Sequence, residues 1–256
     1  MGFLDKLSNA WYIFKTSLSF IKKDKSLLSI PIILILSSIF FFILFILILF
    51  KPIISTIFIF NFIIFLFLMY IWTTFLGSAQ AWMVHEVALG KDTTLASGIK
   101  RAFKNIPDIL LFALATLIIS IIVGSLRKRG TLGNLAGDFI SLVTGIAGKL
   151  VLPAMIITER NFIESIKQLG QAIKAIPEIA VFEIGIRPLT TLLIFISIGL
   201  SFLFGISLSP IIGIILFLIL FLIIIIFSIL INQIYYTLLY LTLIEKKKVP
   251  GLKLKR

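Results

Sequence analysis

Long runs of Ile, Leu and Phe alternate with short polar segments along most of the chain. Several runs reach about 20 residues, the length that an α-helix needs to cross the hydrocarbon core of a bilayer. The pattern predicts six membrane-spanning helices, at about residues 27–50, 53–79, 109–126, 135–157, 179–204 and 210–231. We therefore expect an all-α fold, a polytopic membrane helical bundle that forms one membrane domain over residues 1–256.

Three other segments, each just before a predicted hairpin of spans, have apolar residues at steps of three or four and basic residues on the other faces. They lie at about residues 3–21, 95–106 and 162–176. This pattern is typical of an amphipathic helix that lies on the surface of a leaflet with anionic lipids. The basic residues that we expect to contact lipid headgroups are Lys15, Lys22, Lys23, Lys100, Arg101, Lys104, Lys167 and Lys174.

Two of these regions resemble each other in sequence. RAFKNIPDILLF at residues 101–112 and QAIKAIPEIAVF at residues 171–182 share six of twelve residues. In each, a proline opens a helix and an acidic residue follows in the first turn, where the helix dipole favours negative charge. Asp24 and Pro31 form a weaker third copy. We expect three pseudo-repeats, each a surface helix followed by a transmembrane hairpin, at roughly residues 1–86, 87–159 and 160–256.

The distribution of Lys and Arg predicts the orientation of the spans. The two terminal segments and the second and fourth loops hold eighteen of these residues, whereas the opposite loops hold four, three of them at residues 127–129. Positively charged loops stay cytoplasmic. We expect a multi-pass protein of the cell membrane with both termini in the cytoplasm. The first apolar run is too long for a signal peptide, and no small-residue cleavage site follows it.

Composition supports the membrane assignment. Hydrophobic residues make up 60% of the chain and charged residues 14%, against about 45–50% and about 25% in soluble domains. The chain has no Cys, which excludes disulfides and thiolate chemistry. Its net charge of +13 could suggest nucleic acid, but the basic residues lie beside apolar runs. They predict membrane lipids as partners, not nucleic acid.

No motif of the sequence predicts catalysis. The chain lacks a nucleophile elbow, a phosphate-binding P-loop and a dinucleotide-binding glycine motif. His85 is the only histidine, which leaves a metal site short of ligands. Asp138 has no second membrane aspartate with which it could act as an aspartyl protease. We therefore expect a non-enzymatic protein without a cofactor.

Charged pairs within two predicted spans are the sharpest candidates for a site. Glu183 and Arg187 are four residues apart on one face of the fifth span. They are either a substrate or ion contact or, as we favour, a self-neutralised pair beside a kink at Pro188. Asp138 and Lys149 share one face of the fourth span, although Asp138 is close enough to the basic run at residues 127–129 to be neutralised there.

Uncharged polar and small residues also occur in the spans. Asn61 and Asn232 are further candidates for buried polar groups. Gly137, Ser141 and Gly145 repeat at four-residue spacing in the fourth span, and Ser197, Ser201 and Gly205 do so in the fifth. Such spacing favours close helix packing, with a permeation path as the alternative.

Several short motifs resemble a known family. They are Ala10-Trp11, DKSLL at residues 24–28 leading to Pro31, and VLPAMI at residues 151–156 followed by Glu159. Together they resemble an uncharacterised family of prokaryotic six-span membrane proteins, a domain of unknown function. The resemblance implies six spans with cytoplasmic surface helices, and it brings no activity and no functional residues.

Two functional hypotheses follow. We favour a membrane-organising, curvature-sensing or scaffold protein that forms a homo-oligomer, because three surface helices are predicted on one leaflet. The alternative is a transporter or channel for a small solute, an ion or a lipid, which the internal repeat and the polar residues in the spans support.

Overall fold

A computed structural model describes residues 3–49, 56–128, 130–172, 176–207 and 209–250. These residues are helical apart from short connections, and none of them forms a strand, which confirms the all-α fold class. The elements are α1 (Phe3–Lys23), the short helix η1 (Lys25–Leu28), α2 (Ser29–Leu49), α3 (Thr56–Ala88), α4 (Leu95–Lys104), α5 (Ile106–Arg127), α6 (Gly130–Thr158), α7 (Phe162–Ala172), α8 (Ile176–Ser207), α9 (Pro210–Leu239) and η3 (Tyr240–Ile244).

Five segments of the described chain are long and apolar enough to cross a membrane, which makes this a multi-pass membrane protein. They are Lys25–Leu47, Phe60–Ala88, Ile106–Arg127, Thr190–Ser207 and Pro210–Thr242. The span predicted at residues 135–157 lies within the continuous helix α6, but only Gly148–Thr158 is counted there as an apolar helix. Several other side chains of α6 lie outside the described residues. A sixth span therefore stays a prediction.

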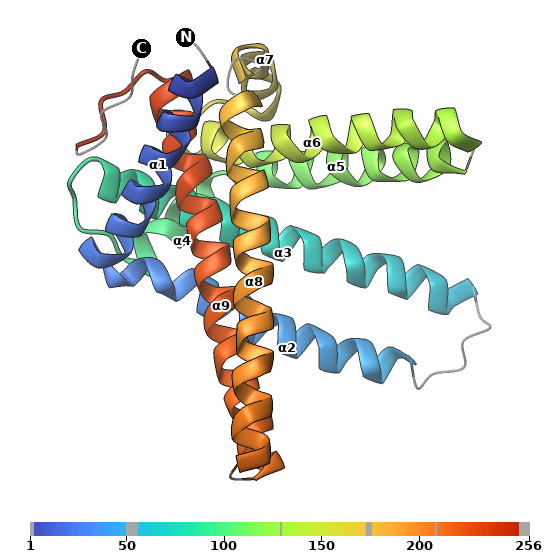
Figure 1. The fold of residues 1–256 in the computed structure, drawn as a ribbon. Helices are drawn as coiled ribbons and strands as arrows, with labels where there is room; N and C mark the ends of the chain where they lie inside the picture. Colours follow the sequence, from blue (N-terminus) through green and yellow to red (C-terminus); the bar gives the residue numbers. More distant parts are fainter. Residues whose placement is uncertain (1–2, 50–55, 129, 173–175, 208, 251–256) are drawn as a thin grey trace.

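A less apolar helix followed by two long apolar helices occurs three times along the chain: α1 with α2 and α3, α4 with α5 and α6, and α7 with α8 and α9. Helices α1, α4 and α7 meet η3 and the adjoining ends of the other helices in one region, which we call the hub (Figure 1). From it, α2, α3, α5 and α6 extend to one side, whereas α8 and α9 extend in another direction (Figure 1). The pair α8 and α9 thus diverges from the other four long helices.

The buried core lies in the hub. Leu27, Leu76, Ile109, Met155 and Ile234 come from five different elements, and each is at most 1% exposed. Further along the long helices the apolar side chains are uncovered, as for example Phe40, Phe195 and Ile211. Exposed apolar surface on this scale suits lipid, not water. The hub is therefore held by protein packing and the outer helices by their lipid environment.

Two acidic side chains join neighbouring groups of helices. Asp24 accepts hydrogen bonds from the backbone N–H groups of Ser26 (2.9 Å) and Thr93 (3.0 Å), the latter at the start of α4. Asp108 accepts one from the N–H of Phe162 (2.9 Å), the first residue of α7. Asp24 and Asp108 occupy equivalent positions in the internal repeats of the sequence. Each fixes the start of the helix that opens the next repeat.

The Asp24 carboxylate is stabilised in its charged form. Burial alone would raise its pKa, but the hydrogen bonds from Ser26 and Thr93 together lower the pKa below its ordinary value. The Ser26 hydroxyl also donates to the carbonyl of Thr93 (3.0 Å), which completes the connection between the two loops. The contact contributes most while Asp24 is ionised.

Arg101 is buried in the hub, with 8% of its surface exposed. Its Nε donates to the carbonyl of Ile156 (2.8 Å), its Nη1 pairs with the Glu159 carboxylate, and its guanidinium lies 4.4 Å from the ring centroid of Trp82. The last carbonyls of a helix have no partner within the helix, and a cation is favoured beside them. Arg101 of α4 therefore caps the C-terminus of α6, and its hydrogen bond and charge lower the pKa of Glu159.

Candidate membrane-embedded cavity

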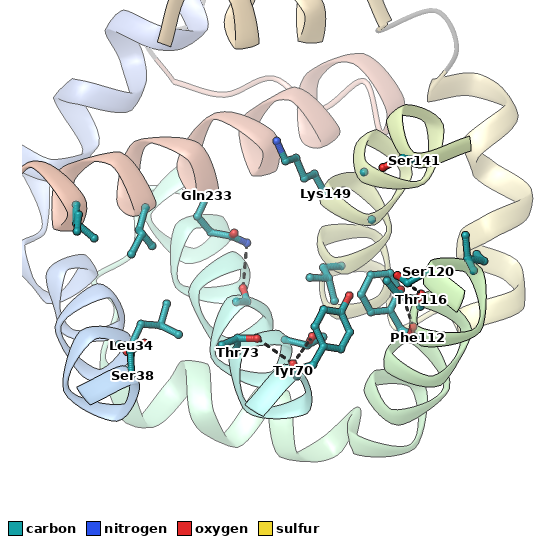
Figure 2. Close-up of a pocket in the computed structure, with 18 of the residues that line it drawn as sticks. Leu34, Ser38, Tyr70, Thr73, Phe112, Thr116, Ser120, Ser141, Lys149 and Gln233 are labelled. Carbon is teal, nitrogen blue, oxygen red and sulfur yellow. Dashed lines mark hydrogen bonds between the residues drawn. The ribbon is translucent and has the colours of Figure 1, made fainter. Parts of the chain in front are cut away.

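A cavity of about 1030 Å³ lies among α2, α3, α5, α6 and α9 (Figure 2). Ligand sites in proteins typically enclose about 300–1,000 Å³. The residues that line it lie mainly in the membrane-spanning segments, and the labelled polar groups come from several different helices (Figure 2). The cavity is therefore large enough for a sizeable organic ligand inside the membrane.

One wall of the cavity carries hydroxyl groups and small residues. On α5, Thr116, Ser120, Gly124 and Arg127 follow at steps of four, four and three, which places them on one face of the helix. On α6 the lining includes Ser141, Gly145, Gly148 and Lys149, and on α3 it includes Tyr70, Thr73, Thr74 and Gly77.

The hydroxyl groups of this wall are satisfied within their own helices. Thr116 donates to the carbonyl of Phe112 (2.9 Å), Ser120 to that of Thr116 (2.8 Å), and Thr73 to that of Tyr70 (2.9 Å) (Figure 2). A hydroxyl that donates in this way keeps lone pairs that can accept a hydrogen bond. The wall can therefore hold polar groups without a cost in unpaired donors when it is empty.

The opposite wall is mainly apolar. It is formed by one face of α2 and by the middle of α9, and its apolar residues are Leu34, Ile35, Ile39, Phe42, Leu222, Ile225 and Ile229. Ser38 is the polar residue that α2 adds to the lining. The two walls together present polar groups and hydrocarbon to the same ligand.

Lys149 and Gln233 lie at the end of the cavity nearest the hub, which we call the inner end. The ammonium group of Lys149 is 3.2 Å from the Tyr236 hydroxyl and 4.6 Å from the centroid of the Tyr236 ring. Gln233 of α9 donates from its Nε2 to the carbonyl of Gly77 on α3 (3.0 Å), which joins the two helices beside the cavity. The Lys149 side chain is therefore held at the wall by an aromatic residue of α9.

Arg127 marks the other, outer end. Its Nη2 is 2.7 Å from the Asp138 carboxylate, and both side chains are largely exposed. Gly148 packs against Phe112 on α5, since a Cβ placed there would lie 3.4 Å from that ring. Phe112 and Arg127 are fifteen residues apart on α5, so at 1.5 Å per residue the inner and outer cations are about 20 Å apart along the helix axis.

The polar candidates predicted from the sequence fall in different places. Asp138 forms its ion pair with Arg127 of the basic run, as its position near that run suggested. Lys149 faces the cavity and is bonded to Tyr236. Asn232 donates to the carbonyl of Ser228 in its own helix (2.9 Å). The side chains of Glu183 and Arg187 lie outside the described residues.

Asn61 was expected to be buried and is exposed in the structure. Near the N-terminal end of α3, Phe62 packs against Phe45 of α2, with ring centroids 5.9 Å apart. The neighbouring side chains Phe60, Ile63 and Ile64 are exposed as well. No helix of the described chain covers this face, so Asn61 has no protein interior to occupy.

The residues predicted to contact lipid headgroups are mostly on the surface. Lys15, Lys22, Lys23, Lys100, Lys104 and Lys167 are all exposed. Arg101 differs, because its guanidinium is engaged with Ile156, Glu159 and Trp82. Lys174 lies outside the described residues.

The sequence analysis identified only some of the residues that line the cavity. Ser141 and Gly145 were noted for their spacing, with packing as the first interpretation and a permeation path as the second. A Cβ added at Gly145 would meet nothing within 4 Å, whereas one at Gly137 would lie 2.8 Å from the Arg127 side chain. Gly137 therefore serves close packing and Gly145 faces open space. The hydroxyl row of α5 was missed, although its four-residue spacing was visible.

Comparisons with known proteins add no identity. No family model matches the chain, and no curated protein or solved structure matches it. The resemblance to a six-span prokaryotic family therefore stays a prediction. Within the described part of the chain, no group of three or more His, Cys, Asp or Glu side chains could hold a metal ion.

Proposed function

We propose that this protein is a non-enzymatic membrane transporter that moves an amphipathic molecule through the cavity among α2, α3, α5, α6 and α9. The observation that carries this proposal is the cavity itself, whose lining is mainly apolar but carries hydroxyl groups on α3, α5 and α6. An ionisable group such as Lys149 is costly within a membrane unless it serves a ligand or a partner. A lining of both kinds matches a molecule with a polar head and an apolar tail.

The proposal also includes the number of membrane spans and the side of the membrane on which the hub lies. We infer six spans, with α6 as the sixth, because its Ser141, Gly145 and Lys149 are tolerated in a membrane when they face a cavity. We also infer that the hub and both termini are cytoplasmic, since the first described residues and the end of the described chain lie together there (Figure 1) and basic segments stay inside.

A substitution that fills the cavity tests the proposal. Gly145→Trp places a large side chain where a Cβ meets open space, so the helix can accept it while the passage closes. The matched control is Gly199→Trp, because a Cβ at Gly199 also meets nothing within 4 Å and this residue of α8 does not line the cavity. Both variants would be purified and reconstituted into vesicles beside the unaltered protein.

The assay uses a fluorescent phospholipid and dithionite, which reduces only the label that reaches the outer leaflet. The unaltered protein and Gly199→Trp are expected to move labelled lipid from the inner to the outer leaflet, where dithionite reduces it. Gly145→Trp is expected to slow this movement strongly. A water-soluble dye trapped in the same vesicles should stay inside. Transport that is equal in all three proteins, or absent from all, would count against the proposal.

A second function is supported by the surface helices. Trp11 on α1, Phe103 on α4 and Ile163 on α7 are about 60% exposed, and exposed lysines such as Lys15 and Lys167 lie on the same helices. Apolar side chains beside cations suit the interface of an anionic leaflet. We propose that these helices organise the membrane around the protein, in an oligomer of this chain.

This second proposal has its own test. Vesicles of anionic lipids would be imaged by electron microscopy with and without the protein, and its oligomeric state would be measured by mass photometry. Trp11→Ser, which removes an exposed apolar side chain, is expected to weaken any change in vesicle shape. A monomeric protein that leaves vesicles unchanged would contradict the membrane-organising role.

A further inference from the structure

We propose that a membrane lipid enters the cavity sideways, through an opening between α2 and α6, and that its head group lies inside along the hydroxyl groups while its tails stay in the bilayer. This inference rests on the proposed transport function and adds the class of the substrate and its route of entry. Its basis is the arrangement of the helices around the cavity and the change in exposure along the residues that line it.

The helices that line the cavity do not close around it. Neighbours in the series α2, α3, α5 and α6 pack against each other, α2 with α3, α3 with α5, and α5 with α6. Within the described part of the chain, no comparable packing joins α2 to α6, the two ends of this series. Helix α9 contacts both of them and crosses the space between them (Figure 2). Closure of the cavity on this side therefore depends on α9.

Helix α9 covers only the inner part of this side. Its lining residues lie between Leu222 and Gln233, and beside them Tyr236 contacts Lys149 of α6 at the hub. The rest of α9 runs with α8, in a different direction from α2 and α6 (Figure 1). Further from the hub, the described helices thus leave the side between α2 and α6 open.

Exposure of the lining residues changes in the same direction. On α2, Leu34 is half-buried near the hub, whereas Phe42 is 61% exposed. On α5, Phe112 is buried, whereas Ser120, about two turns further from the hub, is exposed. Ser141 on α6 is exposed as well. The cavity is therefore covered at its inner end and open beyond it.

The opening faces the hydrocarbon of the bilayer, so lipids are the molecules beside it. Its edge on α2 belongs to the span Lys25–Leu47, and the α5 wall behind it belongs to the span Ile106–Arg127. Ile39 and Phe42 present exposed apolar side chains at this edge, which suit lipid tails. A polar solute would have to leave water to reach the opening, whereas a lipid diffuses to it within the leaflet.

The hydroxyl groups behind the opening suit the head group of this lipid. Ser120 on α5 and Ser141 on α6 both line the cavity (Figure 2). Ser120 donates to a carbonyl of its own helix and can still accept a hydrogen bond, or turn to donate one. Lys149 and Arg127 are already engaged with other side chains. The inference therefore sets no charge for the head group, and phosphatidylcholine, which has no net charge, is the probe.

Fluorescence quenching by spin-labelled lipids tests the inference. The chain has no Cys, so Ser120→Cys and Ile118→Cys each accept a single bimane fluorophore at a similar depth on α5. Ser120 lines the cavity, whereas Ile118 is 49% exposed outside the lining. Phosphatidylcholine vesicles would carry a nitroxide either on the choline head or in the middle of a tail. The head nitroxide is expected to quench the label in Ser120→Cys only, and the tail nitroxide the label in Ile118→Cys.

The outcomes separate this inference from the transport function. A head nitroxide that quenches neither label, or both equally, would overturn the inference, because no head group would then lie in the cavity. A second copy of the chain that covers the opening would give the first of these results. Quenching as expected, without movement of phospholipid in the dithionite assay, would support lipid entry and contradict transport.

Two variants of α2 test the route of entry. Ser38→Trp adds a large side chain to the lining at the opening, whereas Leu36→Trp adds it at an exposed position outside the lining. Ser38→Trp should lower quenching by the head nitroxide in Ser120→Cys to the level in Ile118→Cys, and Leu36→Trp should leave it unchanged. If the two tryptophan variants have the same effect, the lipid does not enter between α2 and α6.

Discussion

The hub and the cavity region use polar residues in opposite ways. In the hub, Asp24 and Asp108 bond to backbone N–H groups of a neighbouring group of helices, and Arg101 of α4 bonds to a carbonyl near the end of α6. At the inner end of the cavity, Gln233 still joins α9 to α3, but further from the hub Thr116 and Ser120 bond to carbonyls of their own helix. The first kind of bond connects elements, whereas the second leaves the helices independent of one another.

This difference suggests a division of labour. The hub holds the three groups of helices together through buried side chains and bonds between groups. The helices that extend from it are covered by few protein contacts, with at most 28% of any candidate span buried. A transporter needs helices that can change their separation while their connection stays intact. The predictions below test this contrast, from the largest effect to the smallest.

Truncation of a buried leucine in the hub should have the largest effect. Leu76 is 1% exposed and Leu36 is 61% exposed, on α3 and α2. Leu76→Ala should lower the free energy of unfolding by about 2–5 kcal/mol, because it leaves a cavity in the core, whereas Leu36→Ala should change it little. Thermal unfolding of both variants in detergent measures this. Equal effects would show that the hub is not the stabilising part of the fold.

Loss of Arg101 should have the next largest effect. Arg101→Lys removes the forked hydrogen bonds to Ile156 and Glu159, which a lysine cannot replace. We expect a loss of about 2 kcal/mol, typical of hydrogen bonds to a charged group. Lys100→Ala, at the exposed neighbour on α4, is the control. If the two variants unfold at the same temperature, Arg101 does not hold α4 to α6.

Asp24 should make stability depend on pH. Because its pKa is lowered in the folded protein, its contribution is fully present above the unfolded pKa of about 3.9 and is lost as the pH falls through the folded value. The difference in unfolding temperature between the unaltered protein and Asp24→Asn should therefore be largest near neutral pH and shrink in acid. Asp92→Asn, at an exposed position in the same loop region, is the control for loss of an acidic side chain. A constant difference at all pH values would contradict the role of the Asp24 carboxylate.

The ion pair at the outer end should matter least for stability. Asp138→Asn should change the free energy of unfolding by less than about 1 kcal/mol, because exposed ion pairs contribute little. The same thermal measurement applies. A loss as large as that of Arg101→Lys would mean that the outer end also holds the fold together.

The sequence predicted the local features well and the spatial ones poorly. The helices and five of the spans follow from runs of Ile, Leu and Phe, because hydropathy is a property of the chain itself. The span in α6 stays a prediction, because several of its side chains lie outside the described residues. The sequence predicted Arg101 on the exposed polar face of its helix. The prediction missed its buried contacts because its partners, Ile156 and Glu159, are more than fifty residues away in sequence.

The cavity was the hardest feature to predict. Its wall combines Tyr70, Thr116, Ser141 and Gln233 from four helices, and a single helix gives no sign of which neighbours it will face. A serine bonded to its own helix also looks the same in sequence whether it faces lipid, protein or a cavity. The divergence of α8 and α9 from the other pairs is likewise a property of contacts in the hub (Figure 1).

The most direct test of the account is whether water reaches the cavity within the membrane. The chain has no Cys, so Ser120→Cys and Ile118→Cys each carry a single thiol at a similar depth on α5, the first in the cavity wall and the second on an exposed apolar face. In vesicles, a membrane-impermeant maleimide should label Ser120→Cys and leave Ile118→Cys unlabelled. Equal labelling of both positions, or labelling of neither, would contradict a hydrated passage through this protein.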